Sequence, residues 1–136
     1  KDGVGALMAA IELVEDRYID YPSFPTPILI ADDFFNTGVV LGTEQYSWKS
    51  ISLSEIKGWM KIDGKEVGSG SGADIMGNPL NALAWLANHC VKLGKPLKAG
   101  GFVMLGSVIQ TVFIEKPAKI QIGFEQLGEV SVDFVA

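Results

Sequence analysis

The spacing of apolar residues predicts one long helix near the middle of the chain. Apolar side chains recur three and four positions apart from Leu80 to Val91, as on one face of a helix. Asn78 is a typical N-cap, and Pro79 fits the first helical position, where no N–H is needed. Gly94 is a suitable C-terminal cap. Because further apolar residues widen this face beyond one stripe, we expect the helix to be buried on more than one side, by the rest of the domain and by a partner subunit.

Shorter runs predict strands before and after this helix. Residues 57–67 form the clearest hairpin, two β-compatible runs joined through Asp63-Gly64, a dipeptide suited to a type I′ turn. Residues 10–18 are compatible with an extended strand in which Glu12 lies on one face. Residues 44–56 are expected to form a surface loop with a short turn. After the helix, further strands are predicted at residues 102–105, 110–114, 119–124 and 130–135.

Length and composition indicate one globular domain covering residues 1–136. The chain is 48% hydrophobic and 20% charged, which is ordinary for a folded protein with a core of its own. Its formal net charge of −5 disfavours nucleic acid or an anionic membrane surface as a partner, because both require clustered Lys and Arg. No apolar run has the length of about eighteen residues that a membrane-spanning helix needs.

The single cysteine, Cys90, lies beside the single histidine, His89, in the predicted helix. Adjacent helix residues point about 100° apart, so the pair is badly placed for proton transfer, and we expect packing for Cys90 and a surface position for His89. A lone cysteine fits a reducing compartment, and we expect a cytoplasmic protein. Because the chain starts at Lys1 without a methionine or a signal-peptide pattern, we expect a processed or truncated start.

A glycine-rich segment, residues 68–77, leads directly into the predicted helix. The free N–H groups of a helix start, together with glycine-loop amides, offer partial positive charge to an anion such as a substrate carboxylate. The residues alone favour a simpler interpretation, a tight turn ahead of a buried helix.

Two further positions are candidates for chemistry. Glu12 stands among Ile11, Leu13 and Val14, and a carboxylate is expensive to bury unless it is paired or binds a metal ion. A strand whose Glu12 face meets water or an arginine is equally compatible. Gly106-Ser107 ends the predicted strand 102–105. Such a small pair lets a ligand approach the backbone, and the hydroxyl can donate to a carboxylate or enolate oxygen, although a simple turn fits equally well.

Three stretches resemble the hydratase and decarboxylase branch of the fumarylacetoacetate hydrolase superfamily. They are GSGA at residues 70–73 with GNPLNA at 77–82 and WLAN at 85–88, AIELVEDRY at residues 10–18, and LGEVSVDF at residues 127–134. The resemblance covers nearly the whole chain. It implies a β-rich α+β fold, a mixed β-roll of the fumarylacetoacetate hydrolase type with one principal helix.

The resemblance also implies site residues. Glu12 corresponds to one of three carboxylate ligands for Mg²⁺ or Mn²⁺ in the family. Gly106 and Ser107 would line the substrate pocket, and the amides near Gly70, Ser71 and Gly72 would help to hold the substrate carboxylate. In the family, the other two metal ligands form a Glu-x-Glu element that precedes this region, together with an active-site lysine region. Neither is present here, so the chain is expected to be the C-terminal portion of a hydratase-like catalytic domain, and no catalytic acid or base is assigned.

One segment departs from the family pattern. Residues 28–42 resemble an Ala-Asp-Asn segment followed by Val-Leu-Gly, but Asp33 stands where asparagine is usual. Phe35 and Asn36 stand where many members have serines. This segment lies near the active site in relatives, so the departure bears on which substrate the chain binds.

The function implied by the resemblance is that of a metal-dependent hydro-lyase in aromatic catabolism. Such enzymes add water to a 2-hydroxy-2,4-dienoate of the 2-keto-4-pentenoate type and give a 4-hydroxy-2-oxoacid, with a divalent ion stabilising the enolate. One alternative is a 2-oxo-3-hexenedioate-type decarboxylase, which uses the same stabilisation. Another is a non-catalytic subunit or fragment with the same fold. The expected partners are a small 2-oxo or 2-hydroxy acid and further copies of the chain, in a homo-oligomer.

Overall fold

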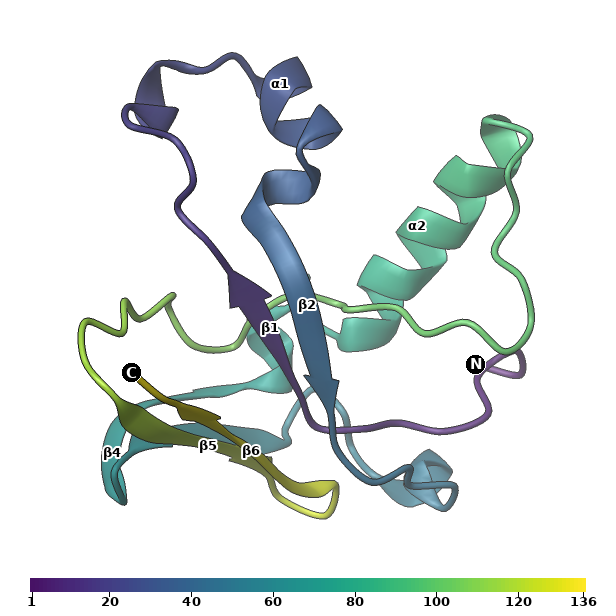
Figure 1. The fold of residues 1–136 in the computed structure, drawn as a ribbon. Coiled ribbons are helices and arrows are strands. Elements are labelled where there is room, and N and C mark those ends of the chain that lie inside the picture. Colours follow the sequence, from purple (N-terminus) through teal and green to yellow (C-terminus); the bar gives the residue numbers. More distant parts are fainter.

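The computed structural model describes all residues from 1 to 136 as two antiparallel sheets and one main helix (Figure 1). The larger sheet has the strand order β4-β3-β5-β6, and the smaller one pairs β1 with β2. The strands are β1 (Ala10–Val14), β2 (Asn36–Leu41), β3 (Lys57–Ile62), β4 (Lys65–Ser71), β5 (Ala118–Phe124) and β6 (Gly128–Phe134). The helices are α1 (Thr26–Ala31) and α2 (Pro79–Lys92), with single 3-10 turns at Tyr21–Ser23, Asp33–Phe35, Trp48–Ser50 and Gly72–Asp74. The predicted α+β class with one principal helix is confirmed.

The hairpins of the larger sheet follow their local sequence. β3 and β4 are joined by Asp63 and Gly64, which both have positive φ, 49° and 80°, as a type I′ turn requires. β5 and β6 form the second hairpin and pair from Ala118 with Phe134 to Phe124 with Gly128. The strands predicted at residues 57–67, 119–124 and 130–135 are therefore confirmed with small shifts at their ends.

The core consists of two small apolar clusters. Ala9, just before β1, and Ile11 within it pack against Ile122 of β5, which fixes the smaller sheet over the larger one. The second cluster surrounds Trp48, which is 1% exposed, and includes Leu53. Residues 44–56 form the predicted loop with a short turn, Trp48–Ser50, but Trp48, Leu53 and Ile56 are buried in it, which the prediction of a surface position missed. A 3-10 turn and irregular backbone point these apolar side chains inward without any regular spacing, so no periodic pattern marks them.

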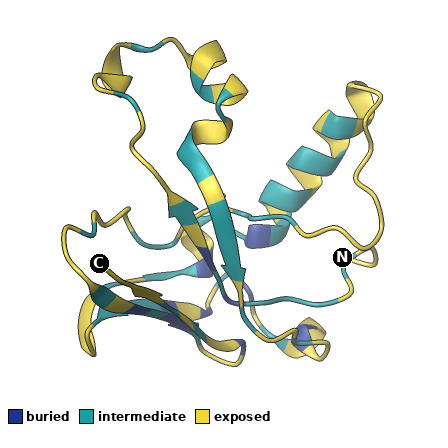
Figure 2. Ribbon diagram, in the orientation of Figure 1, coloured by how far each residue is buried: buried dark blue, intermediate teal, exposed yellow.

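Helix α2 has the predicted ends but not the predicted burial. The Asn78 side chain accepts a hydrogen bond from the Leu80 N–H at 2.9 Å, and Gly94 follows the helix with a φ of 70°. Trp85 and Val91, however, are 58% and 63% exposed, and Pro79 is the one buried helix residue. The expected burial by the rest of the domain is wrong, because α2 packs near its start and then extends away from both sheets (Figure 2). Neither helix of the chain could cross a membrane.

The segment after α2 contains no regular secondary structure as far as β5. The strands predicted at residues 102–105 and 110–114 are therefore wrong. A β-compatible sequence forms a strand only where a neighbour offers its N–H and C=O groups, and no strand of this chain pairs with the segment. Met104 and residues 106–114 of this segment line a pocket instead.

Substitution of Gly72 tests how tightly the turn after β4 is packed. Its N–H donates to the Ile56 carbonyl at 2.9 Å, and a Cβ at this position would lie 1.7 Å from the Leu53 carbonyl oxygen. We expect Gly72→Ala to lower the free energy of unfolding by about 2 kcal/mol or more, because the backbone must shift. Gly38→Ala in β2 is the matched control, since a Cβ there meets nothing within 4 Å. Urea denaturation with equal midpoints for the two variants would contradict this packing.

Candidate functional site

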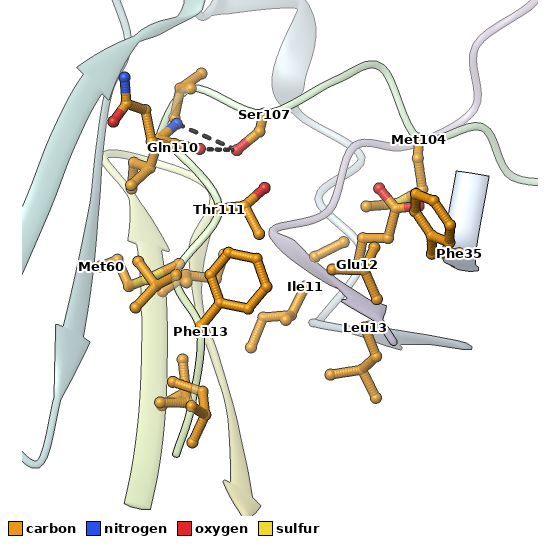
Figure 3. Close-up of a pocket in the computed structure, with 18 of the residues that line it drawn as sticks. Ile11, Glu12, Leu13, Phe35, Met60, Met104, Ser107, Gln110, Thr111 and Phe113 are labelled. Carbon is orange, nitrogen blue, oxygen red and sulfur yellow. Dashed lines mark hydrogen bonds between the residues drawn. The ribbon is translucent and has the colours of Figure 1, made fainter. Parts of the chain in front are cut away.

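A pocket of about 600 Å³ lies between β1 and the face of the larger sheet (Figure 3). The irregular segment that contains Met104 and residues 106–114 forms one side of it. Phe113 and Thr111 lie on that side, and Glu12, Leu13 and Phe35 lie on the other. Of 26 lining residues, 19 are hydrophobic. An apolar pocket with a few polar groups is typical of small-molecule sites.

Glu12 lines this pocket together with the other residues of β1. In β1 the side chain of Ile11 is buried in the core, so the next residue, Glu12, points to the opposite face and is exposed. Its Oε1 accepts a hydrogen bond from the Asn36 side-chain amide at 2.9 Å. Because a carboxylate can accept several further bonds, this contact leaves Glu12 free to bind a ligand. Its exposure also means that no burial cost demands a metal ion.

The residues of this chain do not form a metal site by themselves. No group of three or more His, Cys, Asp or Glu side chains lies close enough together to hold an ion. Mg²⁺ requires six oxygen ligands and takes one or two protein carboxylates together with water and substrate. Glu12 fits one such ligand position, and no group of three such side chains forms around it.

Gly106 and Ser107 line the same pocket as Glu12. Gly106 has a φ of 118°, a conformation that favours glycine. The Ser107 hydroxyl accepts from the Ile109 N–H at 3.2 Å and donates to the Ile109 carbonyl (Figure 3). To bind a ligand oxygen this hydroxyl must therefore rotate about its Cβ–Oγ bond. The structure brings three of the six predicted site residues together, although about ninety positions of sequence separate Glu12 from the other two.

The other predicted residues, Gly70, Ser71 and Gly72, lie outside this pocket. Gly70 and Ser71 end β4 and line a second depression of about 380 Å³ beside Lys57. The Ser71 N–H donates to a carboxylate oxygen of Asp74 at 2.7 Å, and the Gly72 N–H is bonded to a backbone carbonyl. These two amides already have partners within the chain, so a role in holding a substrate carboxylate stays a prediction.

A polar cluster ties the end of β1 to the start of β2. Arg17 donates to the Asn36 carbonyl at 2.8 Å and lies 3.8 Å from a carboxylate oxygen of Asp32. Asp32 also accepts from the Tyr18 hydroxyl at 2.9 Å and from the Phe35 N–H at 3.0 Å. Because Asn36 is also the residue that holds Glu12, this cluster fixes the strand register on which the position of Glu12 depends.

The Asp32 cap supports an unusual turn at the pocket rim. Asp33, Phe34 and Phe35 all have positive φ, between 48° and 69°, which costs free energy in a residue with a bulky side chain. The turn places both phenylalanines against the pocket. Phe35 makes edge-to-face contacts with Tyr18 and Tyr21, at centroid distances of 5.7 Å and 5.4 Å.

Sequence reasoning missed the apolar lining. Phe113 and Thr111 were predicted only as part of a strand, and Phe34 had no predicted role. No local pattern could have identified them, because their position depends on where an irregular segment and a left-handed turn meet. His89, in contrast, is exposed as predicted and stacks on Trp85 at 5.1 Å.

Comparison with known proteins identifies relatives that are named for two activities, hydratases and decarboxylases. No protein-family model matches the chain. It is 35% identical over 129 residues to 2-keto-4-pentenoate hydratases from Paraburkholderia phymatum and from Burkholderia vietnamiensis, covering 93% of this chain and 48% of each relative. It is 28% identical to 4-oxalocrotonate decarboxylase from Pseudomonas putida, over 97% of this chain and 50% of that protein. The chain is a homologue of these hydratases and decarboxylases.

Solved structures agree with these relatives. 4-oxalocrotonate decarboxylase from Pseudomonas putida G7, complexed with magnesium and adipate, matches with a TM-score of 0.83 and 27% identity, over 93% of this chain and 48% of that one. The same enzyme complexed with calcium and acetate matches with a TM-score of 0.79. The resemblance read from the sequence is confirmed. The chain spans about half the length of the curated relatives it matches.

The Asp32 side chain caps the turn at the pocket rim, and its removal tests whether the turn depends on that cap. We expect Asp32→Ala to lower the free energy of unfolding by about 1–2 kcal/mol, because the Phe35 N–H and the Tyr18 hydroxyl both lose their acceptor. Asp32→Asn keeps one acceptor oxygen for the Phe35 N–H, and its amide can donate to the Tyr18 hydroxyl in place of the lost acceptor. With only a partly exposed ion pair lost besides, it should cost about 0.5 kcal/mol. Denaturant unfolding of both variants measures the difference. Equal losses would show that charge, and not the cap, supports the turn.

The same bond affects the titration of Tyr18. Its hydrogen bond to Asp32 raises the pKa of Tyr18 above the ordinary value of 10.0. A raised folded-state pKa means that this bond stabilises the protein fully below pH 10 and is lost as the pH rises past the folded-state pKa. Phenolate absorbance, with Tyr18→Phe to identify the signal, should show that Asp32→Ala returns the pKa towards 10. An unchanged titration would contradict the assignment.

Proposed function

We propose that this chain is part of a hydro-lyase that adds water to a 2-hydroxy-2,4-dienoate of the 2-keto-4-pentenoate type, giving a 4-hydroxy-2-oxoacid. The observation that carries the proposal is the single pocket that unites Glu12 with Gly106 and Ser107, in a chain 35% identical to 2-keto-4-pentenoate hydratases. Decarboxylation of a 2-oxo-3-hexenedioate is the second candidate, supported by the similarity to 4-oxalocrotonate decarboxylase. A place in aromatic catabolism follows for either activity.

The pocket residues have distinct roles in this proposal. The Ser107 hydroxyl turns from the Ile109 carbonyl to donate to an oxygen at the acid end of the substrate. The glycine at position 106 leaves its backbone open to close approach. The apolar walls hold the conjugated carbon chain and keep bulk water away from it, which strengthens the polar contacts at the acid end. The acid and base that move protons are assigned to no residue of this chain.

We further propose that Glu12 supplies one carboxylate ligand to Mg²⁺ or Mn²⁺, with the remaining protein ligands outside these 136 residues. The exposed carboxylate in the pocket and the magnesium and calcium complexes of the structural neighbours support this assignment. When bound, such an ion stabilises negative charge on the enolate oxygen. Asn36 holds the Glu12 carboxylate by one oxygen, Oε1, so the other oxygen remains free.

The domain proposal is that residues 1–136 form the C-terminal portion of a hydratase-like catalytic domain with the mixed β-roll of the fumarylacetoacetate hydrolase type. Only 12 of 136 residues are buried, whereas a self-contained domain of this length normally buries a larger core.

The exposed apolar face of α2 supports association with other copies of the chain in a homo-oligomer. The intact mass of the protein from its source, compared with 14.6 kDa, and its assembly mass by light scattering test the two statements separately.

Glu12→Gln tests the proposed activity. We expect the protein at its native length to hydrate 2-hydroxypenta-2,4-dienoate, and the fall in dienoate absorbance measures the rate. The substitution should lower kcat/KM on the order of 100-fold or more and abolish Mg²⁺ binding in calorimetry, because a carboxylate ligand becomes a neutral amide.

Glu15→Gln is the matched control, since Glu15 also lines the pocket and the charge change is the same. It should leave Mg²⁺ binding within about twofold, because a charge without coordination contributes little in a solvated pocket. Equal losses of Mg²⁺ binding and kcat/KM in the two variants would show that Glu12 acts through its charge and not as a metal ligand. Carbon dioxide release from 2-oxo-3-hexenedioate in place of hydration would favour the decarboxylase.

A further inference from the structure

Two parts of the chain project from the sheets toward the same side of the molecule, the top of Figure 1. One is the arm, the β1–β2 connection of residues 15–35 that carries α1. The other is the helix end, residues 85–98, which comprises the last part of α2 and the loop after it. Neither part contains a buried residue, so each offers most of its surface to a partner.

The arm exposes apolar side chains that its own structure does not cover. Some of its rings pack on one another, since Tyr18 makes edge-to-face contacts with Phe24 and Phe35. Three isoleucines remain exposed, two of them in α1: Ile19, Ile28 and Ile30. α1 has only six residues, and a helix this short is marginal in water without a surface to pack against. A partner that covers the isoleucines would therefore stabilise α1 as well.

The helix end exposes an apolar surface of its own. The Trp85 ring stacks on His89 at a centroid distance of 5.1 Å with 6° between the planes, and both residues are exposed. Three aliphatic side chains that follow them are also exposed: Val91, Leu93 and Leu97. Because tryptophan is enriched among the residues that contribute most to protein–protein binding, Trp85 is suited to anchor such a contact.

The two surfaces carry opposite charge. The arm has one cation, Arg17, and five carboxylates, which are Glu15, Asp16, Asp20, Asp32 and Asp33. The helix end has no carboxylate and three lysines, Lys92, Lys95 and Lys98. A cation in the last turn of a helix stabilises that helix, but Lys95 and Lys98 lie beyond α2. The pair of Arg17 with Asp32 is the only ion pair in the structure, so the lysines have no anionic partner within the chain.

We propose that two copies of this chain associate through these surfaces, with the arm of each copy packed on the helix end of the other. Because both surfaces lie on one side of the molecule, a two-fold axis across that side makes the same contact twice. The isoleucines of the arm then cover the apolar surface around Trp85, and the carboxylates of the arm face the lysines. The inference rests on the homo-oligomer of the proposed function and goes further in naming the two surfaces that meet.

Charge reversal tests the contact. Asp20→Lys gives the arm a cation, and Lys95→Glu gives the helix end a carboxylate. Each variant alone places like charges at both symmetric contacts, so we expect its dissociation constant to rise about tenfold or more, measured by light scattering over a dilution series of the protein at its native length. Lys65→Glu is the matched control and should leave the constant unchanged, because Lys65 is exposed in β4 and lies in neither surface.

A mixture of the two variants gives the decisive result. In a mixed pair, the reversed arm of one copy meets the reversed helix end of the other, and the second contact is that of the original chain. We expect the mixture to recover the association that each variant loses alone. If the mixture fails to recover it, the arm and the helix end do not meet across copies, and the inference is overturned. Unchanged constants in both variants, as when the other half of the protein covers these surfaces, would overturn it too.

Ile30→Asn tests the apolar part of the same contact. It should raise the dissociation constant on the order of tenfold, because an isoleucine covered in the interface becomes polar. Val67→Asn makes the same kind of change at an exposed position of β4 and should have no effect. Equal constants for the two variants would contradict the contact.

Hydration of 2-hydroxypenta-2,4-dienoate, measured on the same samples, separates this inference from the proposed activity. A monomeric protein that hydrates the dienoate would overturn the inference alone. An assembly that responds to the variants as expected but does not hydrate the dienoate would support the inference and overturn only the activity.

Discussion

The pairing of β1 with β2 is the constraint on which the rest of the site depends. Ile11 is buried against the larger sheet and Glu12 is exposed on the opposite face of β1 only in one register, since a slip of one residue would exchange the two faces. Asn36 secures that register twice, because its side chain holds Glu12 and its carbonyl receives Arg17. Asp32 then joins Arg17 to the turn that carries Phe35. A carboxylate and an aromatic ring are thereby fixed on the same side of one pocket.

Much of the fold could be predicted because its signals are local. Asp63-Gly64 specifies a hairpin turn, and Asn78-Pro79 specifies where α2 begins. The errors arose where structure depends on neighbours. Residues 110–114 have a strand-like sequence, but no free strand edge of this chain pairs with them. Trp48 enters the core from an irregular segment that carries no periodic pattern. The burial of α2 was inferred from its apolar surface, although nothing in a sequence states whether a covering element belongs to the same chain.

The site was predictable only through resemblance. Spacing alone left Glu12 and Ser107 with equally good structural interpretations, and nothing local joins them across most of the chain. The fold brings them into one pocket. Gly70 does not line that pocket, although its backbone packs against the Val108 carbonyl, next to Ser107. The positive φ values at residues 33–35 had no sequence signal, since Phe34 and Phe35 are poor candidates for left-handed backbone. The departure of Phe35 from the family pattern was visible, but its consequence for the pocket was not.

The crystal structure of the protein at its native length, with Mg²⁺ and 2-oxohexanoate, tests the central claim most directly. The account predicts that the 2-oxo acid end lies beside Glu12 and Ser107 and that the alkyl end contacts Phe113. A ligand bound instead in the depression beside Lys57 and Ser71, away from Glu12, would contradict it. In that case the glycine-rich end of β4 would be the acid-binding element, and the apolar pocket would serve only for packing.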